Sequence, residues 1–287
     1  MHEKLIVQPG KHFELKDHDP AFTGKFKDEQ EAAEKLAGDL KHMTHYQEVL
    51  YAEQRYALLI ILQAMDAAGK DGTIKHVMSG VNPQGCNVTS FKVPSAEELG
   101  HDYLWRAVKA LPERGHIGIF NRSYYEELIV VRVHPELLEA ERIPTPAGED
   151  SVWKTRYEQI NHFEKYLVEN GTVILKFFLN LSKQEQRNRL LARLDTPGKN
   201  WKFSTSDLKE RFFWDDYMNA YEKMMNHTST EWAPWHIIPA DHKWFTRVAV
   251  ADALVETLKS LNLSYPELTA SQLADLQKAK SKLQSEG

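Results

Sequence analysis

The chain has 287 residues, 42% of them hydrophobic and 27% charged, which is the composition of an ordinary globular protein with a substantial core. Its 36 basic and 41 acidic side chains give a formal charge of −5, so a site for a polyanion must be a local basic patch. The single cysteine, Cys86, excludes an internal disulfide and a cysteine-rich metal site, and no apolar run is long enough to cross a bilayer. We therefore expect a cytoplasmic protein that binds neither membrane nor nucleic acid.

Predicted helices and strands alternate along the chain. The first half predicts an extended arm over 1–26, a helix over 27–55, a strand from 58, a helix over 71–78, a strand over 88–93, a helix over 95–111 and a strand over 116–120. The second half predicts a helix over 151–169, a strand over 172–179, a helix from 183, a strand around 236–238, and helices over 247–261 and 268–283. This alternation favours one large α/β domain whose parallel sheet carries helices on both faces.

A phosphate-binding loop is predicted where the first strand ends. Residues 64–73, with the sequence AMDAAGKDGT, pass from an apolar run through small residues to Gly-Lys. There, backbone N–H groups can close around anionic oxygens at a helix N-terminus, and Lys70 can reach a more distal phosphate. The pattern is degenerate, because Ala64 replaces the first Gly and Asp71 replaces the usual Ser/Thr, so an ordinary strand-to-helix turn is the alternative. The predicted phosphate-binding residues of the loop are Ala67, Ala68, Gly69, Asp71, Gly72 and Thr73.

Asp66 indicates a bound cation. A carboxylate within a phosphate cradle would repel its own ligand unless a cation lay between them, so we expect Mg²⁺ here, with Mn²⁺ as a possible substitute. Asp71 could replace the missing hydroxyl ligand, directly or through water. The alternative for Asp71 is a first-turn charge favoured by the helix dipole.

A second polar stretch, residues 121–127, follows the strand predicted over 116–120. It lies where α/β sheets place their ligands, beyond the carboxyl end of the strand. The family resemblance given below implies that Arg122 and Lys70 clamp the transferring phosphates with magnesium, and the alternative for Arg122 is a salt bridge to a helix acid. Asn121, Ser123 and Tyr125 are candidate ligand-binding residues here, and the family resemblance given below implies that their ligand is a nucleotide. Tyr125 and Trp201 could stack on a base, although core packing is the commoner fate of such aromatics.

A basic segment over residues 183–202 carries six basic side chains against two acidic ones. Arg189 and Arg193 lie four residues apart, so on a helix they share a face, and a Thr-Pro-Gly turn breaks this helix before Lys202. We expect a lid over bound phosphates, with a solvated helical face as the alternative. The predicted phosphate-binding residues outside the loop are Arg189, Arg193, Lys202 and, as a weaker groove candidate, Lys75.

These stretches together resemble the family-2 polyphosphate kinases. The resemblance rests on residues 66–72 (DAAGKDG), 120–126 (FNRSYYE) and 189–207, and it continues to Ala233-Pro234-Trp235. It covers residues 30–262. By this resemblance the loop is a Walker A element and Asn121-Arg122 a Walker B element.

The resemblance implies a P-loop kinase-like α/β fold, a three-layer α/β/α sandwich with a parallel sheet and a helical lid at about 183–215. The implied parts are an N-terminal arm over 1–26, a phosphotransferase domain over 27–265 and a C-terminal helical tail over 266–287. The implied activity is reversible, magnesium-dependent transfer of phosphoryl groups between inorganic polyphosphate and adenine or guanine nucleotides. We also expect a homo-oligomer, either a dimer or a tetramer.

Two positions depart from the pattern of many family members. Asn121 stands where many carry Asp, so Asp66 should carry more of the metal ligation. Glu126 stands where others have Asn, and this form resembles the subgroup that accepts both AMP and ADP. The resemblance thus implies Asp66, Lys70, Arg122 and Glu126 as catalytic residues, with Asp66 and Glu126 as metal ligands. The alternatives are an ATP-dependent nucleoside monophosphate kinase and a non-catalytic polyanion-binding protein.

Overall fold

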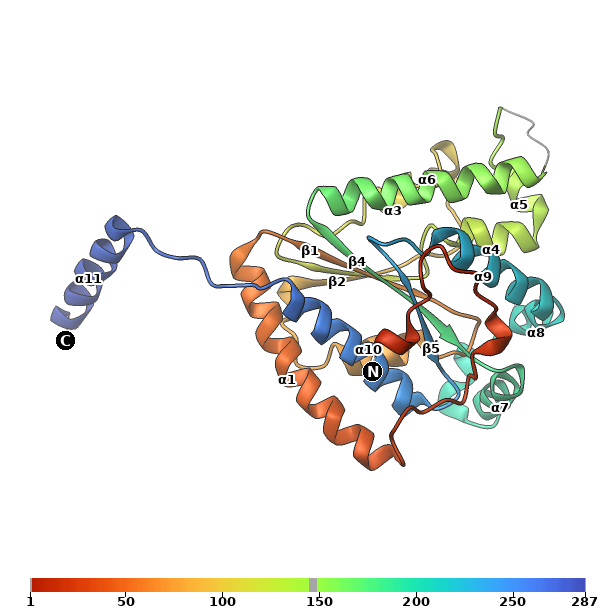
Figure 1. The fold of residues 1–287 in the computed structure, drawn as a ribbon, viewed down its shortest axis with the longest axis horizontal. Helices are drawn as coiled ribbons and strands as arrows, with labels where there is room; N and C mark the ends of the chain where they lie inside the picture. Colours follow the sequence, from red (N-terminus) through yellow and green to blue (C-terminus); the bar gives the residue numbers. More distant parts are fainter. Residues whose placement is uncertain (1, 145–148, 287) are drawn as a thin grey trace.

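A five-stranded parallel sheet forms the centre of the computed structural model, which describes residues 2–144 and 149–286 (Figure 1). Every neighbouring pair of strands is parallel. In spatial order the strands are β2 (Cys86–Ser90), β3 (Ile117–Asn121), β1 (Ala57–Gln63), β4 (Thr172–Asn180) and β5 (Trp235–Pro239). The predicted parallel α/β sheet is confirmed.

Two layers of helices cover the sheet, and each packs on one set of alternating strand residues. One layer contains α1 (Glu29–Glu53), α2 (Lys70–Val77) and α10 (Lys243–Ser260), and it buries Leu58, Ile60 and Leu62 of β1. The other contains α4 (Glu126–Val133), α6 (Glu149–Glu169) and α9 (Trp214–Thr228), and it buries Leu59 and Ile61. Because successive strand residues point to opposite faces, one continuous apolar strand serves both cores. Figure 1 shows α6 on one side of the sheet and α1 and α10 on the other, which is the predicted three-layer sandwich.

The parallel register brings the carboxyl ends of the strands to one edge of the sheet. Leu62 of β1 pairs with Asn121 of β3, and Gln63 pairs with Phe178 of β4. The segments that leave β1, β3, β4 and β5 therefore start side by side. Those after β4 include α7 (Lys183–Leu194), the 3₁₀ helix η5 (Pro197–Lys202) and α8 (Thr205–Phe212).

The arm over residues 2–26 packs along the outer edge of β5. Ile6 forms an antiparallel bridge with His236, and the Val7 N–H donates to the Trp235 carbonyl at 2.8 Å. Farther along, the side chain of Asn226 in α9 exchanges hydrogen bonds with the main chain of Phe13. An arm that covers a sheet edge in this way also blocks further strand pairing there. Short 3₁₀ helices, η1 (His2–Leu5) and η2 (Leu15–Asp17), interrupt it.

The predicted helix over 95–111 is wrong as a continuous element. The predicted capping box does form, since Ser95 N–H donates to Glu98 at 2.7 Å and Glu98 N–H donates back at 3.2 Å. Only η4 (Glu98–Gly100) follows, because Asp102 accepts from the Leu104 N–H at 3.0 Å and starts a new turn. The short α3 (Trp105–Val108) is what remains of the helix.

Other boundaries differ by a few residues. The second strand, β2, begins two residues before the predicted start and ends at Ser90, and η3 (Pro83–Gly85) precedes it. The helix α10 begins at Lys243 rather than Arg247, because the fully buried Phe245 anchors its first turn in the core. The short α5 (Pro135–Ala140) follows α4 and was not predicted.

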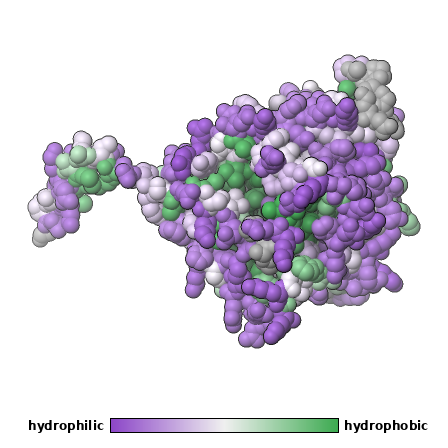
Figure 2. Space-filling model, in the orientation of Figure 1, coloured by the Kyte–Doolittle hydropathy of each residue, from purple (hydrophilic) through white to green (hydrophobic). Residues whose placement is uncertain are grey.

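The C-terminal helix α11 (Ala270–Ser285) stands apart from the body in Figure 1. Its start carries a complete capping box between Thr269 and Gln272. Leu273, Leu276 and Leu283 are exposed, and Figure 2 shows apolar surface on this helix. Within the described residues, no helix is both long and apolar enough to cross a bilayer.

Candidate active site

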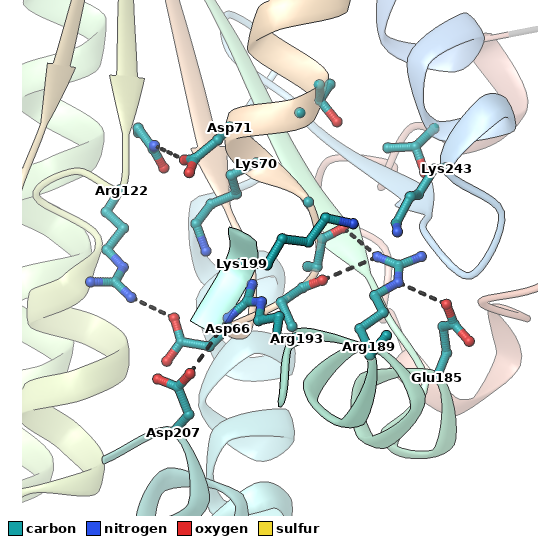
Figure 3. Close-up of a pocket in the computed structure, with 18 of the residues that line it drawn as sticks. Asp66, Lys70, Asp71, Arg122, Glu185, Arg189, Arg193, Lys199, Asp207 and Lys243 are labelled. Carbon is teal, nitrogen blue, oxygen red and sulfur yellow. Dashed lines mark hydrogen bonds and ion pairs between the residues drawn. The ribbon is translucent and has the colours of Figure 1, made fainter. Parts of the chain in front are cut away.

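A cavity of about 1350 Å³ opens at the carboxyl edge of the sheet, bounded by the loop after β1, the ends of β2 and β3, the lid segments and the start of α10 (Figure 3). Eight basic and four acidic side chains line it, so it holds a surplus of four positive charges within a chain of net charge −5. The acidic residues are Asp66, Asp71, Glu185 and Asp207, and the basic ones are Lys70, Lys92, Arg122, Arg189, Arg193, Lys199, Lys243 and Arg247. The local basic patch that a polyanion requires is therefore present.

The loop after β1 has the backbone of an anion cradle. Gly69 adopts a φ of +106° and directly precedes α2. The Thr73 N–H donates to the Gly69 carbonyl at 2.9 Å, which closes the first turn of this helix. A Cβ at Gly69 would meet its nearest atom at an ordinary 3.7 Å, so conformation rather than space requires glycine there. Ala67 holds a φ of +65°, which is costly for a residue with a Cβ. The residues of the first turn of α2 line the cavity, and the unpaired N–H groups of a helix N-terminus are suited to bind an anion.

Lys70 lies folded against this loop. Its ammonium donates to the carbonyl oxygens of Ala64 at 2.8 Å and Met65 at 3.4 Å, which leaves one of its three N–H donors for a ligand. Burial lowers the pKa of Lys70 to about 8, and the neighbouring Arg122 adds to this effect against the opposing charge of Asp66. The amine therefore titrates near the working pH of a typical enzyme.

Asp66 and Arg122 are paired across the two predicted polar stretches. The Arg122 Nη2 donates to Asp66 Oδ1 at 2.6 Å, so the predicted salt bridge of Arg122 goes to the loop and not to a helix. Beside it, Asn121 Nδ2 donates to Asp71 Oδ1 at 2.8 Å. The structure thus brings the loop after β1 and the stretch after β3 together, as strand-end geometry requires.

Asp207 supplies a second cavity carboxylate near Asp66. It lies on α8, and Arg193 Nη1 approaches it at 3.5 Å. Burial raises the pKa of Asp207, and the negative charge of Asp66 raises it further, which indicates that the two carboxylates are close. Hard oxygen donors of this kind suit Mg²⁺ or Mn²⁺, and a cation between them would relieve their repulsion. Among the residues that the structure describes, no group of three or more acidic, His or Cys side chains could hold a metal ion by itself.

Arg189 lines the cavity but uses all its donors within the protein. Its Nε donates to Glu185 at 2.8 Å, and its two terminal nitrogens donate to four main-chain carbonyls, at Ala67 (3.2 Å), Ala68 (2.8 Å), Ala240 (2.6 Å) and Asp241 (3.0 Å). A guanidinium has five N–H donors, and all five are engaged. In this arrangement Arg189 fixes the lid helix α7 to the phosphate loop, so the predicted contact of Arg189 with phosphate would require some of these bonds to break.

Several other predicted site residues lie outside the cavity. Tyr125 is fully buried, and its hydroxyl donates to Glu164 at 2.7 Å, so it belongs to the core and does not stack on a base. Ser123 is also buried and bonds Gln63 and the Tyr125 N–H. Lys75 is exposed on α2, away from the cavity wall. The cavity lining does not include these three side chains, which face the core or open solvent. The side chain of Lys202 lies outside the described residues.

Glu126 lies behind the cavity wall and not on it. Burial raises the pKa of its carboxyl group, while Arg122 and then Lys70 oppose that rise. In the amide orientation that satisfies its neighbours, Gln63 Nε2 donates to Glu126 Oε1 at 2.8 Å. Glu126 is therefore placed to adjust the charges of Arg122 and Lys70.

Sequence reasoning missed several cavity residues. Lys92 and Asp207 had no assigned role, and Lys199 was only counted within the basic segment. Lys243 and Arg247 follow β5, whose carboxyl end meets the same edge of the sheet as β1 and β3. The same strand-end rule that identified Arg122 could have found them.

The comparisons with known proteins agree on one family. A sequence model described as "Polyphosphate kinase 2 (PPK2)" matches residues 25–266. The ADP-polyphosphate phosphotransferase of Rhodopseudomonas palustris is 55% identical over 85% of this chain and 84% of its own. The AMP/ADP-polyphosphate phosphotransferase of Meiothermus ruber is 48% identical over 92% and 96%. The crystal structure of polyphosphate kinase 2 from Arthrobacter aurescens TC1 covers 96% of both chains with a TM-score of 0.87 and 42% identity.

Proposed function

The chain belongs to the polyphosphate kinase 2 family, and from this premise we propose that it transfers phosphoryl groups reversibly between inorganic polyphosphate and AMP or ADP. The observation that carries the proposal is the cavity itself. Lys70, Arg122 and Asp66 meet at a phosphate loop whose surroundings hold a surplus of positive charge. Such a site suits a substrate that carries about one negative charge per phosphate.

The proposed reaction is a direct in-line displacement. A phosphate oxygen of the acceptor nucleotide attacks the terminal phosphorus of the chain, a new P–O bond forms, and the bridging P–O bond breaks as the chain leaves one phosphate shorter. The acceptor oxygen is already ionised near neutral pH, so neither a general base nor an enzyme nucleophile is needed. Lys70 and Arg122 supply positive charge where charge is redistributed.

We propose Mg²⁺ as the metal, with Mn²⁺ as a substitute. Asp66 would hold it, and Asp207 lies close enough to share this role. A bound magnesium ion neutralises phosphate charge and fixes the orientation of the reacting groups. Asp66 must then exchange its bond to Arg122 for the metal, which would free the guanidinium to bind a phosphate.

A single incubation tests the activity. The purified protein is mixed with polyphosphate, magnesium and AMP, and the AMP, ADP and ATP are then resolved by chromatography. ADP and ATP should form without added ATP. Formation of ADP only when ATP replaces polyphosphate would indicate a conventional monophosphate kinase, and absence of any product despite polyphosphate binding would indicate a polyanion-binding protein. The Lys70→Ala variant should fold and be inactive, because Lys70 contacts the phosphate loop and not the core.

We also propose that Glu126 favours the shorter acceptor. AMP brings one phosphate fewer than ADP, so its attacking oxygen depends more on the charges that Glu126 adjusts at Lys70 and Arg122. Glu126→Asn should therefore reduce kcat/KM for AMP about tenfold more than for ADP. Equal losses for both acceptors would limit Glu126 to a general role, and a wild-type protein inert towards AMP would refute the dual specificity.

The remaining parts of the proposal concern organisation. We propose the division into an arm over 1–26, a phosphotransferase domain over 27–265 with its lid at about 183–215, and a helical tail over 266–287. Adenine and guanine nucleotides are the proposed acceptors, and a dimer or tetramer is the proposed assembly. The cytoplasm remains the predicted compartment.

A further inference from the structure

Gln186 connects the phosphate loop to the lid helix α8. It lies in the first turn of α7, is 1% exposed and does not line the cavity. Its Nε2 donates to the main-chain carbonyl of Asp66 at 2.9 Å, and its Oε1 accepts from Arg211 Nη1 at 2.7 Å. Because the carbonyl can only accept and the guanidinium can only donate, both ends of this amide have matching partners.

The α7 helix holds three successive carbonyls of the loop. The Gln186 bond holds the carbonyl of Asp66. Arg189 holds the carbonyls of Ala67 and Ala68. Between them lies the left-handed backbone of Ala67, with a φ of +65°, which persists only where its surroundings hold it. Gln186 and Arg189 are three residues apart and share one face of α7, so this face fixes the main chain at Asp66.

The other end of the Gln186 side chain fixes α8. Arg211 Nη1 also donates to the Lys183 carbonyl at 2.9 Å, so two bonds tie α8 to the first turn of α7. Asp207 lies four residues before Arg211, on the same face of α8, and lines the cavity. Figure 3 shows the Asp207 carboxylate beside that of Asp66, whose charge adds to the effect of burial in raising the pKa of Asp207. One buried amide thus stands between the main chain of Asp66 and the helix that carries Asp207.

We propose that Gln186 is a positioning residue, which sets the separation of Asp66 and Asp207 and thereby the affinity for the divalent cation that these carboxylates would share. This proposal rests on the proposed function and gives a role to a residue behind the cavity wall. The spacing of the carboxylate oxygens matters because Mg²⁺ requires near-ideal octahedral geometry. Replacing a residue that orients metal ligands from behind typically weakens metal binding by roughly 10- to 100-fold.

The test breaks the connection at each end. Gln186→Met keeps the length of the side chain but removes both bonds, whereas Arg211→Ala removes only the bond on the α8 side. Electron paramagnetic resonance of Mn²⁺, without nucleotide or polyphosphate, gives the Kd of the metal for each protein. This Kd should rise about tenfold in Gln186→Met and about threefold in Arg211→Ala. If Gln186→Met does not fold, as judged by urea denaturation, Arg211→Ala still decides the outcome.

Two further readouts separate positioning from a merely structural role. The free Mg²⁺ concentration that gives half of the maximal rate should rise by the same factors, whereas kcat at saturating Mg²⁺ should fall less than about threefold, because excess metal draws the carboxylates back together. The effects on the Mn²⁺ Kd should also not add. Gln186→Met/Arg211→Ala should match Gln186→Met, which already lacks the bond that Arg211→Ala removes.

Two neighbouring variants serve as controls. Gln184→Met changes an exposed glutamine of the same turn, whose amide donates to Asn188 at 3.1 Å. Arg187→Ala removes an exposed charge that acts on Arg211. Neither should change the Mn²⁺ Kd by more than about twofold.

Three outcomes would overturn the positioning role. They are an unchanged Mn²⁺ Kd in folded Gln186→Met or Arg211→Ala, effects of these two variants that add, and an active wild type that binds no Mn²⁺ in the absence of substrates. Failure of the proposed function would instead appear as a wild-type protein that makes no nucleotide product from polyphosphate, and the Mn²⁺ titrations do not depend on that product.

Discussion

At the scale of single residues, Lys70 should set the alkaline limit of activity. Its charged ammonium is the form that we propose binds phosphate, and burial lowers its pKa to about 8. Because kcat/KM reports the free enzyme, kcat/KM for polyphosphate should be full below pH 8 and fall as pH rises through that value. Arginine stays charged over the whole pH range, so the residual activity of Lys70→Arg should not fall above pH 8. Measuring kcat/KM of the wild type and of Lys70→Arg from about pH 6 to 10 tests this. If the activity of Lys70→Arg still falls above pH 8, another group causes the fall.

Arg189 should contribute to stability before it contributes to substrate binding. Arg189→Lys leaves some of the four buried or half-buried carbonyls without a donor, so we expect a loss of roughly 2 kcal/mol in the free energy of unfolding. Urea denaturation of the ligand-free protein measures it. Arg193→Lys is the matched control, since Arg193 has one 3.5 Å contact with Asp207 and should cost less than about 1 kcal/mol. If Arg189→Lys is as stable as the wild type but binds polyphosphate weakly, Arg189 is a phosphate ligand after all.

The sequence predicted where the site lies better than it predicted what each side chain contacts there. Asp66, Lys70 and Arg122 line the cavity because loops at strand ends meet there, and strands are visible in the sequence. Arg189 shares a helix face with Arg193, as spacing predicts, but the carbonyls that hold it come from residues 51 to 122 positions away. Spacing along one helix carries no information about such distant partners.

At the scale of elements, the N-terminal arm should be part of the folded core. Phe13 is 6% exposed, and its main chain is held by Asn226, whereas Phe22 in the same arm is 41% exposed. Phe13→Ala should therefore lower the free energy of unfolding by roughly 3 kcal/mol, and Phe22→Ala by less than half of that. Urea denaturation of both variants gives the comparison. Equal small losses would mean that the arm is only loosely attached in solution.

Elements with strong periodicity were predicted well, and those decided by distant contacts were not. The run from Leu58 and the helix over 27–55 follow directly from apolar patterning and helix propensity. The helix predicted over 95–111 has a valid capping box but ends at Gly100, where Asp102 starts a new turn through its bond from the Leu104 N–H. Local signals thus start an element, whereas tertiary packing decides how far it extends.

At the scale of the whole molecule, charge is segregated. The chain carries a net charge of −5, yet its cavity holds a surplus of four positive charges. A long-range field of this sign does not attract polyanions, so affinity must come from contacts within the cavity. The composition predicted this arrangement correctly, although it gave no location for the patch.

Salt should therefore weaken the use of polyphosphate more than the use of nucleotide. Each phosphate contact adds roughly 0.7 to the slope of log KM against log salt for a flexible polyanion. Lys199, Lys243 and Arg247 of the cavity add to the cations at the phosphate loop. Raising salt from about 50 to 200 mM should increase KM for long-chain polyphosphate more than tenfold. The KM for ADP should rise less than about threefold, because its shorter phosphate chain meets fewer cations. Both constants are measured at one fixed concentration of free magnesium, so that competition for the metal does not enter. Equal slopes for the two substrates would show that polyphosphate contacts no more cations than ADP does.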